Sequence, residues 1–129
     1  MQQTFVISEK LEGLNDYIEL CKKRRGNYNP AQKYKKDIQK DIVAFIKQRK
    51  VRKIKRPCFV SFTWYEQQRR RDKDNVAFAK KFILDAMKEA GVLPDDGNRY
   101  LEGFADYFVY GEGQKVVVKI VEVDEVDKD

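Results

Sequence analysis

The sequence predicts a single α+β domain in which a small mixed sheet of about four strands packs against about three helices. Two observations predict this class. The 129-residue chain contains 42% hydrophobic residues, which is enough for one packed core. Its hydrophobic pattern also changes period along the chain and gives the order strand, helix, helix, strand, helix, strand, strand. One domain is therefore expected over residues 1–129, with residues 124–129 as an acidic, frayed tail.

The first half of the chain contains one predicted strand and two predicted helices. Aromatic and β-branched residues at 4–8 are typical of a strand. Apolar residues spaced for one helical face predict a helix within 11–25, which Gly26 ends. Asn29 and Pro30 then predict the N-cap and first residue of a helix that extends to near Arg49. The apolar stripe of this helix consists of Ala31, Tyr34, Ile38, Ile42, Phe45 and Ile46.

The second half contains the other three strands and the third helix. Pro57 precedes a strand at 58–64 that is rich in aromatic and β-branched residues. An apolar face that repeats every three or four residues predicts a helix over 76–90, which Gly91 ends. Two further strands are expected at 104–110 and 115–123, and the glycine-containing segment between them predicts a hairpin loop.

The chain contains no histidine and only two cysteines, Cys21 and Cys58. The absence of histidine excludes catalysis by an imidazole base and zinc sites that need a histidine ligand. The widely separated cysteines indicate ordinary thiols in a reducing compartment, so a cytoplasmic location is expected. No segment has the roughly 20 apolar residues of a membrane span, and no signal peptide is expected. Carboxylates, lysines, arginines, tyrosines or a bound metal must supply any chemistry.

The net charge of +6 conceals an uneven distribution. Residues 1–71 carry 19 basic and 7 acidic side chains, a net +12, whereas residues 72–129 carry 8 and 14, a net −6. Basic residues cluster at 22–25, 47–56 and 69–71, which indicates a polyanionic partner such as nucleic acid. The alternative is a solvated surface that only maintains solubility. The candidate DNA-binding surface comprises the helix at 30–49 and Lys53, Lys55, Arg56, Arg69, Arg70, Arg71 and Lys80.

Two aspartates, Asp72 and Asp74, lie between the third basic cluster and the third predicted helix. Residues two apart in an extended segment point the same way, so both carboxylates can face one point. Mg²⁺ prefers oxygen ligands and usually takes one or two protein carboxylates with water and substrate phosphate. A third carboxylate, from Asp95 or Asp96, lies on the loop after the same helix and approaches the pair if the last two strands fold back beside the second. The alternative is that these aspartates only cap a helix and form a tight turn.

A lysine on the third helix is a further candidate. Lys81 lies two helical turns after Asp74 and so shares its face of a continuous helix, whereas Lys80 is rotated away. A lysine that faces a metal-bound phosphate stabilises the negative charge of phosphoryl transfer. The alternative is an ion pair with Asp85 four residues later, worth about 0.2–0.5 kcal/mol on an exposed helix.

Three stretches together carry a family resemblance: Arg-Arg-Arg-Asp-Lys-Asp-Asn at 69–75, Lys-Lys-Phe-Ile-Leu-Asp-Ala-Met at 80–87, and Ala-Gly-Val-Leu-Pro-Asp-Asp-Gly at 90–97. They resemble the RusA-type Holliday-junction resolvases. The resemblance implies a small homodimeric endonuclease, often carried by phages or prophages, that nicks four-way DNA junctions symmetrically with Mg²⁺, or with Mn²⁺ in its place. It also implies that Asp72, Asp74 and Asp96 bind the metal and that Lys81 assists catalysis. The Gly/Pro-rich basic N-terminal loop common in that family is absent.

The expected reaction is hydrolysis of a phosphodiester bond by metal-activated water, with residues 69–71 binding phosphates beside the cut. A C2 dimer supplies the two active sites that a junction with approximate two-fold symmetry requires. Trp64, Tyr65 and Phe78 are candidates for insertion into an unstacked junction, although aromatic residues at such positions are more often core. Two other classes stay open: a non-catalytic module that binds branched DNA, and a nuclease for flaps or other branched nucleic acids.

Overall fold

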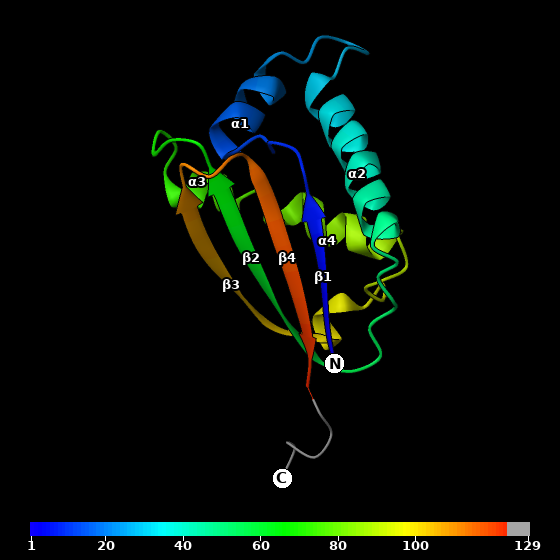
Figure 1. Cartoon of the computed structure of the whole chain (residues 1–129). Coiled ribbons are helices and arrows are strands. Elements are labelled where there is room, and N and C mark those ends of the chain that lie inside the picture. Colours follow the sequence, from blue (N-terminus) through cyan, green and yellow to red (C-terminus); the bar gives the residue numbers. More distant parts are fainter. Residues whose placement is uncertain (124–129) are drawn as a thin grey trace.

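The computed structural model describes residues 1–123 and confirms a small α+β domain with a four-stranded mixed sheet (Figure 1). The predicted tail at 124–129 lies outside the described residues. The strands are β1 (Gln2–Ile7), β2 (Cys58–Glu66), β3 (Leu101–Tyr110) and β4 (Lys115–Glu122). The helices are α1 (Leu14–Lys22), α2 (Pro30–Gln48), α3 (Lys73–Ala77), α4 (Lys80–Glu89) and the short 3₁₀ helix η1 (Gly97–Arg99).

The strand order is β1-β4-β2-β3, so the predicted hairpin between the last two strands is wrong. β3 pairs in parallel with β2, and β4 pairs antiparallel with both β2 and β1. The helices α3 and α4 connect β2 to β3, and such a helical connection allows two neighbouring strands to pair in parallel. β3 thus occupies one side of β2. The segment 111–114 therefore carries the chain across the end of β2 to its other side. The Gly111 N–H donates to the Glu66 carbonyl (2.9 Å), and the Gly113 N–H donates to Gln67 Oε1 (3.1 Å).

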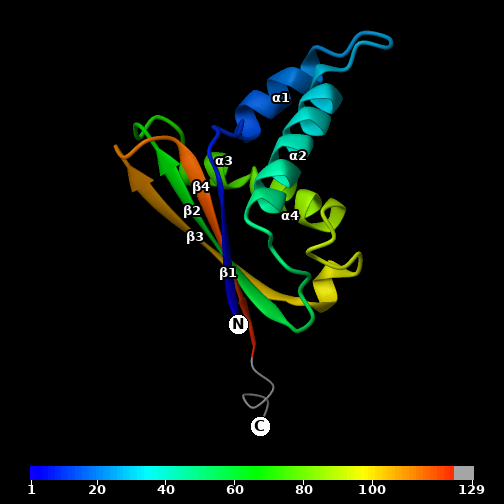
Figure 2. The same ribbon diagram turned by 45° about the vertical axis from the view of Figure 1, so that its right-hand side comes forward.

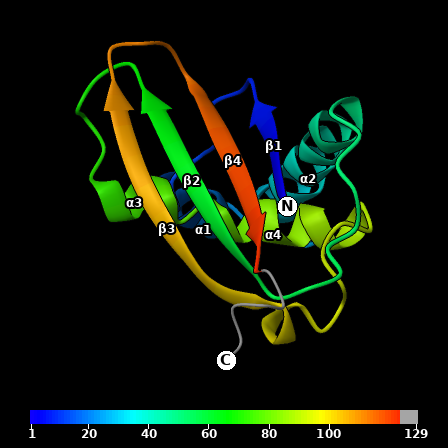
Figure 3. The same ribbon diagram turned by 60° about the horizontal axis from the view of Figure 1, so that its bottom comes forward.

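All the helices cover one face of the sheet, as Figures 2 and 3 show. Alternate residues of each strand point into the layer between sheet and helices because side chains alternate across a strand. In β2 these residues are Cys58, Val60, Phe62, Trp64 and Glu66, all buried. Trp64 is only 2% exposed, so it belongs to the core and is not available for insertion into DNA. No helix in residues 1–123 is long and apolar enough to cross a bilayer.

The long helix α2 begins where the sequence predicts it. Asn29 is the N-cap, and its Oδ1 accepts the Gln32 N–H at 3.1 Å, while Pro30 occupies the first helical position. The residues Ala31, Ile38, Ile42 and Ile46 of the predicted stripe are buried. The preceding helix α1 is shorter than the expected 11–25, because Leu11 lies in the core and Gly13 is its N-cap.

The predicted third helix is interrupted. α3 ends at Ala77 and α4 begins at Lys80. Around the break, the Ala79 N–H donates to the Val76 carbonyl and the Lys81 N–H to the Phe78 carbonyl, both at 3.2 Å. These bonds span three residues rather than four, so the chain is tightened locally and the helical phase shifts. Asp74 and Lys81 therefore lie on two different helices, and the prediction that they share one helical face is wrong.

Candidate functional site

Asp72 and Asp74 both lie at the start of α3, just beyond the end of β2, and both are exposed. Asp72 is the N-cap residue, with extended dihedral angles (φ −63°, ψ 149°), and Asp74 lies in the first helical turn. The segment is therefore extended only as far as Asp72. The Asp72 side chain makes no capping hydrogen bond to the described residues, while Asp74 Oδ1 accepts the Asn75 N–H at 2.9 Å. Capping does not account for the Asp72 carboxylate, which remains available to a ligand.

Asp96 lies at the opposite end of the sheet from this pair. It immediately precedes η1, and the Tyr100 carbonyl that follows accepts the N–H of Cys58, the first residue of β2, at 2.7 Å. Asp72 follows Glu66, the last residue of β2, after the short loop 67–71. The eight residue steps of β2 at about 3.3 Å each separate the two ends by about 26 Å. The predicted set of three carboxylates is not assembled within one chain.

The structure therefore fits the predicted three-carboxylate magnesium site only in part. No group of three acidic or cysteine side chains in residues 1–123 is arranged to hold a metal ion. Two carboxylates on one turn still match what Mg²⁺ commonly takes from a protein, because water and substrate phosphate complete its coordination. Asp96 instead lies 3.8 Å from an Arg99 guanidinium nitrogen, and both side chains are exposed.

The two candidate lysines have protein partners. Lys81 Nζ lies 3.3 Å from Asp85 Oδ1, so the alternative ion pair is confirmed, on a lysine side chain that is 65% exposed. Lys80 Nζ lies 2.5 Å from Asp106 Oδ2, and the Trp64 indole N–H donates to the other Asp106 oxygen at 2.9 Å. This network joins α4 to β2 and β3. Lys80 is therefore mostly buried against the sheet rather than presented to a phosphate in solution.

The three arginines before Asp72 have different environments. Arg71 turns inward: its Nε and Nη2 each donate to Glu66 carboxylate oxygens at 2.8 Å, and Nη1 donates to the Leu11 carbonyl at 3.0 Å. Gln114 also donates to Glu66, so this buried carboxylate has partners from two segments of the chain. Arg71 is thus wrongly predicted as a DNA contact, because its guanidinium fixes the loop that precedes Asp72. Arg69 and Arg70 are exposed.

Asn75 is a structural residue that the sequence analysis did not identify. Its Oδ1 accepts the Asn15 N–H at 2.8 Å and so caps the N-terminus of α1 from another part of the chain. The N-cap of α1 is Gly13, which has no side chain to do this. A Cβ at Gly13 would lie 2.8 Å from Asn75 Oδ1, closer than such contacts occur. Gly13 falls within the helix predicted at 11–25, so the sequence carried no signal of this contact.

A row of aromatic side chains on β3 lies beside the two aspartates. The Arg69 guanidinium lies 4.1 Å from the centre of the Tyr110 ring. Lys73, between the two aspartates, lies 5.4 Å from the same ring and 5.6 Å from that of Phe108. These distances suit cation–π contacts. Arg69 and Lys73 are therefore positioned close to Asp72 and Asp74, at the same end of the sheet.

The second basic cluster lies at the other end of the sheet. Lys53, Lys55 and Arg56 belong to the exposed part of the connection that leads into the start of β2. Lys53 and Lys55 line a hollow of about 430 Å³ with Met1, Arg52 and Glu122. The basic cluster at 69–71 thus lies at the end of the sheet that carries Asp72, and Lys53, Lys55 and Arg56 lie at the end that carries Asp96.

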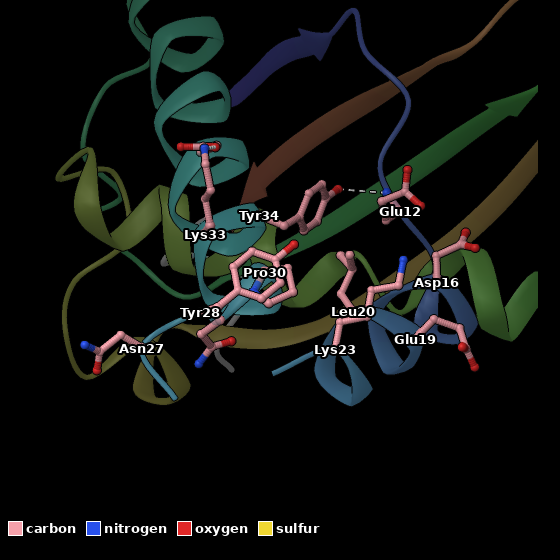
Figure 4. A pocket seen from close by; sticks show the side chains of 12 residues that line it. Glu12, Asp16, Glu19, Leu20, Lys23, Asn27, Tyr28, Pro30, Lys33 and Tyr34 are labelled. Carbon is pink, nitrogen blue, oxygen red and sulfur yellow. Dashed lines mark hydrogen bonds and ion pairs between the residues drawn. The ribbon is translucent and has the colours of Figure 1, made fainter. Parts of the chain in front are cut away.

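A cleft of about 710 Å³ lies between α1 and α2 (Figure 4). The Glu12 N–H donates to the Tyr34 hydroxyl at 2.8 Å, and burial raises the pKa of Tyr34 to about 12. Burial and the neighbouring Asp16 raise the pKa of the Glu12 carboxyl. The charged residues of the lining are Glu12, Asp16, Glu19, Lys23, Lys33 and Asp37, a predominantly acidic set that does not suit a polyanion.

Comparison of the chain with protein-family models and with curated proteins finds no match. The chemistry of the site must therefore be inferred from its own residues. These residues are the two exposed carboxylates of Asp72 and Asp74, with Arg69, Arg70 and Lys73 next to them in the chain. The hydrogen bonds between Arg71 and Glu66 fix the loop that precedes them.

Proposed function

We propose that this protein is a metal-dependent endonuclease that acts on branched DNA, with the four-way junction as its substrate. The observation that carries the proposal is the pair Asp72 and Asp74, which is exposed, close to basic side chains and preceded by a loop that the hydrogen bonds of Arg71 fix. The resemblance of residues 69–97 to the RusA-type resolvases supports the same assignment. The absence of histidine is compatible with it because metal-assisted hydrolysis needs no imidazole.

In this proposal each residue has a stated task. Asp72 and Asp74 hold Mg²⁺, which when bound polarises the scissile phosphate and lowers the pKa of a coordinated water. Arg69 and Arg70 bind phosphates next to the cut and orient the backbone. Arg71 positions Asp72 through its hydrogen bonds to Glu66 and Leu11, because these fix the intervening loop. Fixing this loop should support catalysis, because small displacements of catalytic groups reduce reaction rates strongly.

The separation of Asp96 from the pair has a direct implication for a dimer. If Asp96 shares a metal site with Asp72 and Asp74, it must come from the partner subunit, because within one chain these residues follow opposite ends of β2, which are about 26 Å apart. A C2 dimer with the subunits antiparallel brings the Asp96 end of each chain to the Asp72 end of the other and creates two equivalent sites. This arrangement also unites the two basic ends of the sheet at each site.

Mixing two inactive variants tests this arrangement. We expect Asp72→Asn and Asp96→Asn homodimers to bind a labelled four-way junction but not to nick it. After subunit exchange, half of the dimers are mixed, and each mixed dimer has one intact site, so about one quarter of all sites recover. Asp95→Asn serves as the matched control and should remain active. If the third carboxylate came from the same chain, mixing would restore nothing; if Asp96→Asn alone stayed fully active, Asp96 would have no part in the site.

The substrate class is tested separately with the wild-type protein. Labelled four-way junction, flap and plain duplex are each incubated with Mg²⁺ and with chelator, and the products are resolved on denaturing gels. Symmetric, Mg²⁺-dependent nicking of the junction supports a resolvase, whereas preferential cutting of the flap identifies the other branched-DNA nuclease. Binding without cleavage on every substrate refutes the enzyme and leaves a non-catalytic branched-DNA-binding module.

A further inference from the structure

One face of the sheet points away from the helices (Figures 1 and 3), and it carries exposed aromatic side chains. Phe59 is 51% exposed and Tyr107 is 58% exposed, although large aromatic side chains usually lie in the core. They belong to neighbouring strands, β2 and β3, and both point outward because the alternate residues of β2 are buried. This outer face, as defined by the strand register, consists of Gln2, Thr4, Val6, Phe59, Ser61, Thr63, Tyr65, Gly103, Ala105, Tyr107, Val109, Lys115, Val117, Lys119 and Val121.

A shallow hollow of about 200 Å³ lies between these rings. Phe59 and Tyr107 line it, together with the small side chains of Ser61 and Ala105, and Lys119 and Val121 also contribute. The Phe59 ring lies over Gly103, since two of its carbons are 3.5 Å from the position of a Cβ there. The hollow is smaller than the roughly 300–1,000 Å³ of typical small-molecule sites, which favours a single planar ring as its occupant.

The outer face carries positive charge only. Its charged residues within the described strands are Lys115 and Lys119, and its register positions include no aspartate or glutamate. Lys119 is exposed and lies beside Ser61 on β2 and Thr4 on β1. Lys115 Nζ lies 4.5 Å from the centre of the Tyr65 ring. Exposed rings interleaved with lysines and hydroxyl groups match a strand of nucleic acid with unpaired bases, because bases stack on rings and phosphates attract lysines.

A second copy of the chain is the competing occupant, and the charges oppose it. A two-fold dimer through this face brings the same surface of both subunits together. It would bury Lys119 from each copy against hydroxyl and apolar groups, with no carboxylate on the facing surface to pair with it. Burying an unpaired ammonium group is costly. A polyanion does not impose this cost.

We propose that the outer face of the sheet binds single-stranded nucleic acid, with unpaired bases stacked on Phe59 and Tyr107 and phosphates bound by Lys119 and Lys115. This goes beyond the nuclease proposal, because it involves neither Asp72 nor a metal and uses the face opposite to α3. A flap carries a single strand with unpaired bases, and this face offers that strand a binding surface.

The test measures fluorescence anisotropy of a labelled oligothymidylate with the full-length protein in low salt and chelator, so that no cleavage occurs. Replacing Phe59 or Tyr107 with Ala should weaken binding about 5- to 150-fold each, whereas Phe59→Tyr and Tyr107→Phe should retain affinity. Lys119→Gln should reduce the slope of log affinity against log salt by about 0.7, the loss of one single-strand phosphate contact. Tyr28→Ala is the matched control, because Tyr28 is 60% exposed but lies between α1 and α2.

Binding to a perfect duplex should change little in the two Ala variants, because paired bases are not available to the rings. Three results would overturn the proposal: no binding of the oligonucleotide by the wild type, unchanged affinity in both Ala variants, or a dimer that dissociates in those variants while single-strand affinity persists. The last result identifies the outer face as a contact between two copies. Asp72→Asn should retain single-strand binding, so failure here and failure of the nuclease proposal are distinguishable.

Discussion

Arg70 and Arg71 are adjacent in the chain but are expected to respond very differently to replacement by Ala. The Arg71 side chain is 14% exposed and its partner Glu66 is 7% exposed. Removing one member of a buried ion pair costs about 3–5 kcal/mol, because the other charge remains buried without compensation. Gln114 still donates to Glu66 in the variant, so we expect the lower end of this range, about 3 kcal/mol.

The expected change in melting temperature follows from chain length. An unfolding entropy of about 2.1 cal/mol/K per residue over 129 residues converts 3 kcal/mol into a decrease of about 11 °C. Urea and thermal denaturation followed by circular dichroism measure both quantities. Arg70→Ala should stay within about 0.5 kcal/mol of wild type, since Arg70 is exposed, but should reduce the salt slope of duplex binding by about 1.

A double variant separates the lost ion pair from a general loss of packing. Replacing Arg71 with Met and Glu66 with Leu removes both charges while keeping side-chain volume, so most of the lost stability should return. A structural role for Arg71 is refuted if Arg71→Ala reduces the free energy of unfolding by less than about 1 kcal/mol and instead weakens DNA binding with the same salt dependence as Arg70→Ala. Arg71 would then contact phosphate, as the sequence alone suggested.

Three further predictions concern individual side chains. Asn75→Ala should reduce the free energy of unfolding by about 1 kcal/mol, the value of a helix cap, and Gly13→Ala should cost more because of its clash; urea titrations that show no change in either would contradict the contact. Burial raises the pKa of the Cys58 thiol from its usual 9.0 to about 11, so the folded protein keeps a proton that the unfolded chain releases. The Cys58 thiol should therefore lower the free energy of unfolding by about 2 kcal/mol from pH 9 to 11, and Cys58→Ala should remove that share of the fall while the share of Tyr34 remains. Lys81→Ala should leave junction nicking within a few-fold of wild type, because Lys81 pairs with Asp85; a hundred-fold loss would restore the catalytic role that the resemblance implies.

Local chemistry predicted the individual elements well. The cap at Asn29, the proline at the first helical position and the apolar stripe fix α2 without reference to the rest of the chain. The aromatic and β-branched content of residues 58–64 was equally informative, since these residues form most of β2. Both signals depend only on neighbours within a few residues.

The errors concern relations between distant segments. A hairpin loop and a loop that crosses the end of another strand have the same glycine-rich composition. The last strand takes the second course because β3 occupies one edge of β2 and β4 pairs with its other edge. The Asp72 to Asp96 separation follows from the same topology, because α3 and α4 return the chain to the start of β2 before β3 begins. Arg71 looked like its neighbours because its burial depends on Glu66 and Leu11, which sequence patterns do not connect to it.

The crossing segment at 111–114 has a consequence for how the protein is made. The loop that leads to Asp72 begins at Glu66 and Gln67, and these residues are bonded to Gly111 and Gly113, more than forty residues later in the chain. Gln114 adds side-chain hydrogen bonds to Tyr65 and Glu66. A nascent chain that has not yet extended past this segment lacks those bonds, so the aspartate loop gains this support only after residues 111–114 have been synthesised. If the protein is the nuclease proposed above, chains that lack this segment would also lack a fixed aspartate loop and should be inactive.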